Sequence, residues 1–157
     1  MKSYDVSVYP SKVALPREEQ LAYRLAGLAT HRSEIDPEAR EMVINRFIDN
    51  AAVAIAAISR EPVANARSQA LCHPRARGAS VFGMPIEQKF DAEWAAWANG
   101  TAVRELDMHD TFLAADYSHP GDNIPPILAV AQQCGAIQGL SGVDLVRAVL
   151  AAYEVQI

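Results

Sequence analysis

Apolar side chains recur at intervals of three and four residues along most of the chain, which is the spacing of one face of an α-helix. The longest run follows Asp36 and Pro37, where the aspartate can accept hydrogen bonds from free amides and the proline suits the first helical position. Its stripe consists of Ile44, Ile48, Ala51, Ile55 and Ile58. Because further small and aliphatic residues widen this stripe, we expect a helix that is covered on most of its sides.

The same periodicity predicts helices before and after this run. The first opens at Pro16, buries Leu21, Leu25 and Leu28 as one stripe, and ends at residues 31–33. The later ones span residues 63–71, 91–106, 123–137 and 141–157, with Gly139 ending the fourth and a capping box at Ser141–Asp144 heading the last. Residues 1–15 are expected to form an extended arm, 79–83 a short extended segment and 112–122 a polar loop.

This series of helices predicts an all-α fold, a multi-helix bundle. Alanine fills 28 of the 157 positions while aromatic residues make up 7%, a balance that favours closely packed helices over sheet. Trp94 and Trp97 are expected in the core, because aromatic residues at helical spacing usually lie there. The last helical pattern runs to Ile157 without a cap, so the pattern leaves open a truncated chain or a natural end that frays.

Charge and composition exclude several classes of protein. The 19 acidic and 14 basic side chains give a net charge of −5, which argues against a nucleic-acid binder. No stretch approaches about 20 uninterrupted apolar residues, and the N-terminus lacks the layout of a signal peptide. Cys72 and Cys134 make neither a disulfide framework nor a zinc site on their own. We expect a soluble, cytoplasmic protein without nucleic-acid or membrane partners.

Residues with chemical potential gather between positions 99 and 123, which hold two of the four histidines and four aspartates. If the helix continues to Thr111, then Asp107, Asp110 and Thr111 share one face. His119 lies beyond on the loop, where its imidazole can approach the same space and transfer protons near neutral pH. The helix start after Gly121 offers free amides to a carboxylate. Taken singly, a loop aspartate or a lone histidine is more often structural.

Three motifs in this region carry a family resemblance. They are NGTA at residues 99–102, LDMHDTF at 106–112 and SHPGDN at 118–123. Together they closely resemble the MmgE/PrpD family, and the run DTFLAADYSHPGDNIPP at residues 110–126 is similar to the branch of the family that dehydrates 2-methylcitrate. Other members share the motif layout but have a shorter loop before the His-Pro pair. The resemblance extends over nearly the whole chain.

The resemblance implies a large all-helical domain with a smaller α/β domain inserted later in the chain. Residues 1–157 then form the N-terminal part of the helical domain, and the remaining segments are absent. By position in the motifs, Asp107 and His119 are the implied catalytic residues, while Thr111, Gly121 and Asn123 are implied to bind substrate. Further active-site groups, including lysines and another histidine, come from later segments. His109 stands where relatives often carry aspartate, which we interpret as a feature of the dehydratase branch.

The implied reaction converts 2-methylcitrate to 2-methyl-cis-aconitate in propionate catabolism, with citrate as a secondary substrate. No metal, iron–sulfur cluster or other cofactor is implied, and a homodimer is allowed. The substrate is a small tricarboxylate, yet this acidic chain has only three lysines. Arg75, Arg77 and Arg104 can help, but we expect much of the binding charge to lie elsewhere and residues 1–157 alone to be inactive.

Two alternative functions remain open at this point. The first is a metal-dependent phosphohydrolase of the HD type, in which His109 and Asp110 would bind a divalent ion together with His73 and Asp122. The second is a non-catalytic helical module that binds a partner, or a second copy of itself, through an exposed apolar face. The family resemblance explains the His-Asp pair better than the first alternative does.

Overall fold

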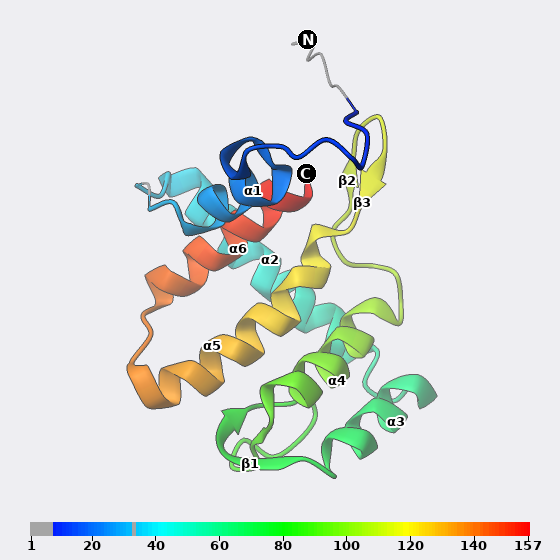
Figure 1. Ribbon diagram of the computed structural model, residues 1–157. Helices are drawn as coiled ribbons and strands as arrows, with labels where there is room; N and C mark the ends of the chain where they lie inside the picture. Colours follow the sequence, from blue (N-terminus) through cyan, green and yellow to red (C-terminus); the bar gives the residue numbers. More distant parts are fainter. Residues whose placement is uncertain (1–7, 33) are drawn as a thin grey trace. The chain divides into compact units, whose positions relative to one another are not determined.

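A computed structural model describes residues 8–32 and 34–157 (Figure 1). The chain divides after Arg32 into two compact units. Six α-helices dominate the described residues, and the paired strands among them are two residues long. The predicted all-α class is therefore confirmed. No single described helix is long and apolar enough to cross a membrane. Helices α2 (Pro37–Ala56) and α3 (Glu61–Ala70), which meet at 104°, reach that length and apolar character only as a bent pair.

The first unit contains a 3₁₀ turn, η1 (Arg17–Glu19), and helix α1 (Leu21–Thr30). The prediction of one helix from Pro16 is wrong, because Gln20 adopts an extended conformation between the turn and the helix. The predicted buried stripe is also wrong, since Leu21 is 70% exposed and α1 has no buried residue. Residues 1–7 of the predicted arm lie outside the described residues.

The second unit begins with α2 (Pro37–Ala56), whose predicted start is confirmed. The Asp36 carboxylate accepts hydrogen bonds from the amides of Glu38, at 2.8 Å, and Ala39, at 3.3 Å. The expectation that this helix is covered on most sides is wrong, because Ile48 is 63% exposed. Neighbouring residues lie 100° apart around a helix, and here the inward face is a different set from the isoleucine stripe. That buried set is Val43, Asn50, Val53 and Ala54.

Helix α4 (Ala92–Arg104) forms the centre of the core and packs against α2, α3 and α5 (Ile124–Gln138). Its buried face consists largely of alanines, which let the neighbouring helices approach closely: Ala92, Ala95, Ala98 and Ala102. Trp94 is partly buried, with its ring stacked on that of His73 at 4.1 Å, but Trp97 is 62% exposed. The prediction that both tryptophans belong to the core is therefore wrong for Trp97.

The extended segment β1 (Pro74–Ala79) lies earlier than the predicted 79–83. It bridges to Phe90 at Pro74 and at Ala79. Gly78 explains why the pairing falls here, because a Cβ at this position would lie 2.1 Å from the carbonyl oxygen of Phe90. Only glycine permits so close a backbone approach.

Two further helices complete this unit, α5 (Ile124–Gln138) and α6 (Gly142–Gln156). Their predicted ends are confirmed: Gly139 takes the left-handed conformation that terminates α5, and Ser141 and Asp144 form the capping box of α6. Val43, Ile124, Val149 and Tyr153 form the core cluster between α2, α5 and α6.

The predicted polar loop at residues 112–122 has more structure than expected. Phe112–Leu113 (β2) and Tyr117–Ser118 (β3) pair as an antiparallel hairpin, and Pro120–Asn123 form a 3₁₀ turn, η2, that leads into α5. In Figure 1 the hairpin, in yellow, follows the green helix α4 along the chain and precedes α5. This connection carries the candidate site.

Candidate active site

The chain turns sharply after α4 instead of continuing as a helix. Helix α4 ends at Arg104, and Asp107 has a φ of 52°, in the left-handed region that non-glycine residues rarely occupy. The predicted helical face formed by Asp107, Asp110 and Thr111 is therefore wrong. After this reversal the Asp107 carboxylate contacts Arg104, whereas the Asp110 carboxylate contacts Tyr153.

A different element, the β2–β3 hairpin, brings Thr111 and His119 together. In its register Phe112 faces Ser118, so Thr111 and His119 flank the same end of the ladder. The Thr111 hydroxyl lies 3.3 Å from Nδ1 of His119. Within the described residues, Asp107, His109 and His119 each place a ligand atom within 4.8 Å of the other two. The carboxylate, the hydroxyl and the imidazole expected from the sequence thus share one site.

His109 is the buried residue of this cluster, and the sequence predicts a site role for it only as a metal ligand in the HD-type alternative. It is 4% exposed, and its ring lies 5.0 Å from the ring of His119. Its Nε2 lies 2.8 Å from Asp122 Oδ1 and 3.5 Å from Arg104 Nη1. The same guanidinium contacts Asp107 Oδ1 at 3.1 Å. The signal in the sequence is its position between Asp107 and Thr111, inside the family motif.

Asp110 faces the helical core instead of the cluster. Its buried carboxylate accepts a hydrogen bond from the Tyr153 hydroxyl at 2.8 Å and lies 3.6 Å from Arg46 Nε. Burial, followed by the hydrogen bond to Asp110, raises the pKa of Tyr153 far above its ordinary value. Asp110 therefore links the connection between α4 and α5, which carries the site, to α2 and α6.

The substitution Tyr153→Phe is expected to lower the free energy of unfolding by about 1.5–3 kcal/mol at neutral pH, because it removes a hydrogen bond to a buried carboxylate. The raised pKa means that the folded chain retains the phenolic proton above pH 10.0, where the unfolded chain loses it. Stability therefore falls as pH rises above that value, by up to roughly 1.4 kcal/mol per pH unit from this group. Urea unfolding across this pH range should show that Tyr153→Phe lacks this decrease.

The exposed Tyr117 provides the control, since Tyr117→Phe should change neither quantity. An unchanged alkaline decrease in Tyr153→Phe would contradict the assignment.

Gly121 and Asn123 were predicted to bind substrate. In the structure Gly121 lies against Asp110, and Asn123 contacts α6. A Cβ on the buried Gly121 would lie 1.9 Å from Asp110 Oδ1. The Asn123 amide nitrogen donates to the Pro120 carbonyl at 3.1 Å and to the Gln156 side chain. In the described part of the chain neither residue makes a hydrogen bond to the His119 side chain, and their substrate role stays a prediction.

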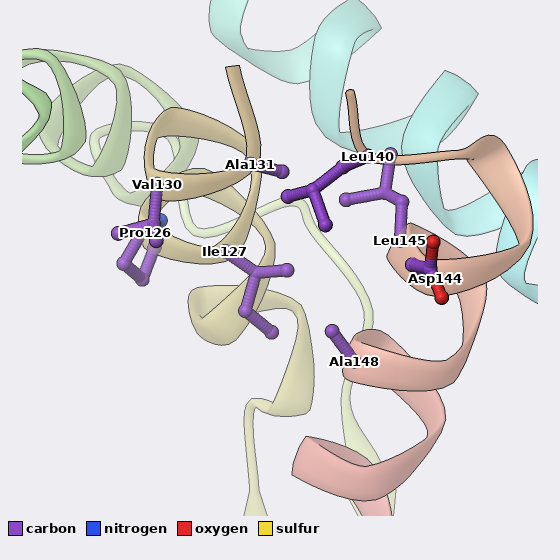
Figure 2. Close-up of a pocket in the computed structure, with 8 residues that line it drawn as sticks. All are labelled: Pro126, Ile127, Val130, Ala131, Leu140, Asp144, Leu145 and Ala148. Carbon is purple, nitrogen blue, oxygen red and sulfur yellow. The ribbon is translucent and has the colours of Figure 1, made fainter. Parts of the chain in front are cut away.

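A groove of about 710 Å³ adjoins the cluster along α4. Arg104 and Asp122, which contact the cluster, also line this groove, and its walls include Trp94, Trp97, Thr101 and Pro126. A second cavity, of about 440 Å³, lies between α5 and α6 and is lined by apolar side chains such as Ile127, Leu140 and Leu145, apart from Asp144 (Figure 2). The groove along α4 is therefore the one in contact with titratable groups of the cluster.

Asp107, His109 and His119 are also the residues that could hold a metal ion. A first-row ion requires nitrogen and oxygen ligands at about 2.0–2.2 Å. These atoms would have to move closer, and the Arg104 guanidinium, which contacts two of the residues, opposes a second cation. The HD-type ligand set does not form, because His73 stacks on Trp94 and Asp110 bonds to Tyr153.

Comparison with known proteins identifies related sequences. The family model for the MmgE/PrpD N-terminal domain matches residues 19–157. A protein of Saccharomyces cerevisiae named "Probable 2-methylcitrate dehydratase" is 40% identical over 70 residues, which cover 39% of this chain and 14% of that protein. A mitochondrial 2-methylcitrate dehydratase of Yarrowia lipolytica is 38% identical over 77 residues, 45% of this chain and 15% of that protein.

A bacterial relative gives a similar result. The 2-methylcitrate dehydratase of Salmonella typhimurium is 44% identical over 54 residues, which cover 34% of this chain and 11% of that enzyme. In these three comparisons the chain spans between 11% and 15% of the length of its relative.

Proposed function

Because the chain belongs to the MmgE/PrpD family through the N-terminal domain that residues 19–157 match, we propose that it supplies part of the active site of a 2-methylcitrate dehydratase. The convergence of Asp107, Thr111 and His119 is the observation that carries this proposal. The names of the relatives support the same activity. Citrate as a second substrate, a role in propionate catabolism and a cytoplasmic location belong to the same proposal.

The reaction requires proton transfers at two atoms and no change in oxidation state overall. A base removes the proton from the carbon beside a carboxylate, the electron pair forms the carbon–carbon double bond, and the neighbouring hydroxyl leaves as water after protonation. His119 is suited to proton transfer because a neutral imidazole can accept a proton near neutral pH. Asp107 then orients His119 or shares its role.

Thr111 positions the imidazole of His119. Its hydroxyl contacts Nδ1, and in the described part of the chain Nε2 makes no hydrogen bond. This contact holds the ring with Nε2 available for the reaction. The substrate carboxylates are bound by Thr111, by the segment at Gly121–Asn123 and by cationic groups contributed by other parts of the enzyme.

Residues 1–157 alone are expected to be inactive, because the three lysines and exposed arginines of this acidic chain do not balance a trianion. A full-length polypeptide that contains them is expected to dehydrate 2-methylcitrate. For both samples the rate of dehydration is measured as the increase in ultraviolet absorbance of the conjugated product.

A sample carrying His119→Ala, purified in parallel, reports the background from contaminating enzymes. Turnover by residues 1–157 above that background would contradict the expected inactivity. A full-length polypeptide that leaves 2-methylcitrate unchanged would overturn the proposed function itself.

A further inference from the structure

Arg104 occupies the point where the α4 groove meets the candidate active site. It is the last residue of α4, where the negative end of the helix dipole favours a cation. Its side chain, 46% exposed, lines the groove and contacts Asp107. A positive charge is therefore held at the entrance of a site whose proposed substrate is an anion.

The guanidinium retains unused hydrogen-bond donors. Nη1 contacts Asp107 at 3.1 Å, and Nε forms a longer ion pair with Asp122 Oδ2, whose 4.0 Å separation is beyond hydrogen-bonding distance. Nη2 makes no hydrogen bond to any residue that the structure describes. Asp122 has a closer partner than Arg104, because His109 Nε2 lies 2.8 Å from its other carboxylate oxygen. The Nε and Nη2 pair is the edge of an arginine that binds a carboxylate with two parallel hydrogen bonds.

The wall of the groove suits a small organic acid. Trp94, Trp97, Thr101 and Arg104 follow at helical spacings of three, four and three residues and share one face of α4. The face thus combines an indole surface, a hydroxyl and a guanidinium, and the carboxylates of Glu93 and Asp122 also line the groove. The groove volume of about 710 Å³ is in the range of small-molecule sites.

We infer that Arg104 binds a carboxylate of the substrate in the groove along α4 and so directs the anion toward His119. This inference rests on the proposed function for the identity of the substrate. The recognition itself depends only on the arginine edge and the groove, so any compact di- or tricarboxylate of this size is a suitable probe.

Binding of propane-1,2,3-tricarboxylate to the full-length polypeptide tests this role by calorimetry. This probe lacks a hydroxyl and cannot be dehydrated, so affinity is measured without turnover. Arg104→Gln is expected to weaken binding by about 10- to 100-fold, and Arg104→Lys by a smaller factor, because lysine retains the charge but not the two-pronged edge.

Arg75→Gln is the matched control. Arg75 is also among the arginines expected to help bind the substrate, but it does not line the groove along α4. It has the same 46% side-chain exposure and pairs with Asp91 at the opposite end of α4, at 2.9 Å, where it lowers the pKa of that carboxyl. This variant should bind the probe as the unmodified protein does. Asp107→Asn separates direct binding from an effect transmitted through Asp107, since removing this negative charge should leave binding unchanged or make it tighter.

Unchanged affinity in Arg104→Gln, or an equal loss in Asp107→Asn, would overturn the inference. If Arg104→Gln does not fold, as judged by its circular dichroism, Arg104→Lys decides, and unchanged affinity in that variant overturns the inference. A full-length protein that binds the probe through Arg104 but does not dehydrate 2-methylcitrate would reject the proposed function and retain the anion site. Dehydration of 2-methylcitrate by a protein whose probe binding does not depend on Arg104 would retain the proposed function and reject the anion site.

Discussion

Replacing His119 by alanine in the full-length polypeptide is expected to lower kcat for 2-methylcitrate by about 10²- to 10⁴-fold, the usual contribution of a positioned proton-transfer group. KM should change much less, because the imidazole acts on the reacting atoms and the carboxylates are bound elsewhere. Initial rates of product formation over a range of substrate concentrations separate the two quantities.

His31→Ala is the control for the loss of a histidine in general. His31 is exposed and follows the end of α1, outside the unit that contains the site. This variant should retain the full rate. Near-normal turnover in His119→Ala would remove His119 from the mechanism, whereas equal losses in both variants would point to damage unrelated to the site.

Gly121→Ala is expected to lower the free energy of unfolding by about 2–4 kcal/mol, through overpacking and a broken hydrogen bond. The new Cβ would lie 1.9 Å from Asp110 Oδ1 and 3.0 Å from the buried Asn50 Nδ2. The Asp110 carboxylate has little freedom to withdraw, because Tyr153 and Arg46 hold it. The midpoint of urea unfolding measures the loss.

Gly100→Ala provides the comparison, since nothing lies within 4 Å of a Cβ at this position inside α4. It should stabilise the chain by about 0.5–1 kcal/mol, the ordinary gain for alanine over glycine in a helix. If Gly121→Ala unfolds at the same urea concentration as the unmodified chain, then Asp110 moves aside freely and does not anchor the segment.

Short-range chemistry made several helix boundaries predictable from the sequence. Asp36 with Pro37, Gly139, and Ser141 with Asp144 each specify a helix end through contacts within three or four residues. Burial was less predictable, because it depends on which elements pack together. Ile44, Ile48 and Ile55 of the predicted stripe are exposed for this reason, although they follow the helical spacing.

The candidate site was predicted in part. The family motifs singled out Asp107, Thr111 and His119, and the structure brings these side chains together. The element responsible was not predictable, because strands of two residues leave too short a pattern to distinguish from a loop. Periodicity also gave no sign of the left-handed residue that follows α4. The sequence indicates His109 only as a feature of the dehydratase branch or a ligand of the HD type, although it is the buried member of the cluster.

The unusual backbone of Asp107 decides how its carboxylate can be examined. Asparagine tolerates a φ of 52° far better than most side chains, whereas alanine has no short polar group to compensate locally. An alanine variant would therefore mix the loss of charge with a rearranged turn, and a drop in rate could not be assigned to either. Asparagine at this position keeps the bend and alters only the chemistry, which makes it the informative replacement.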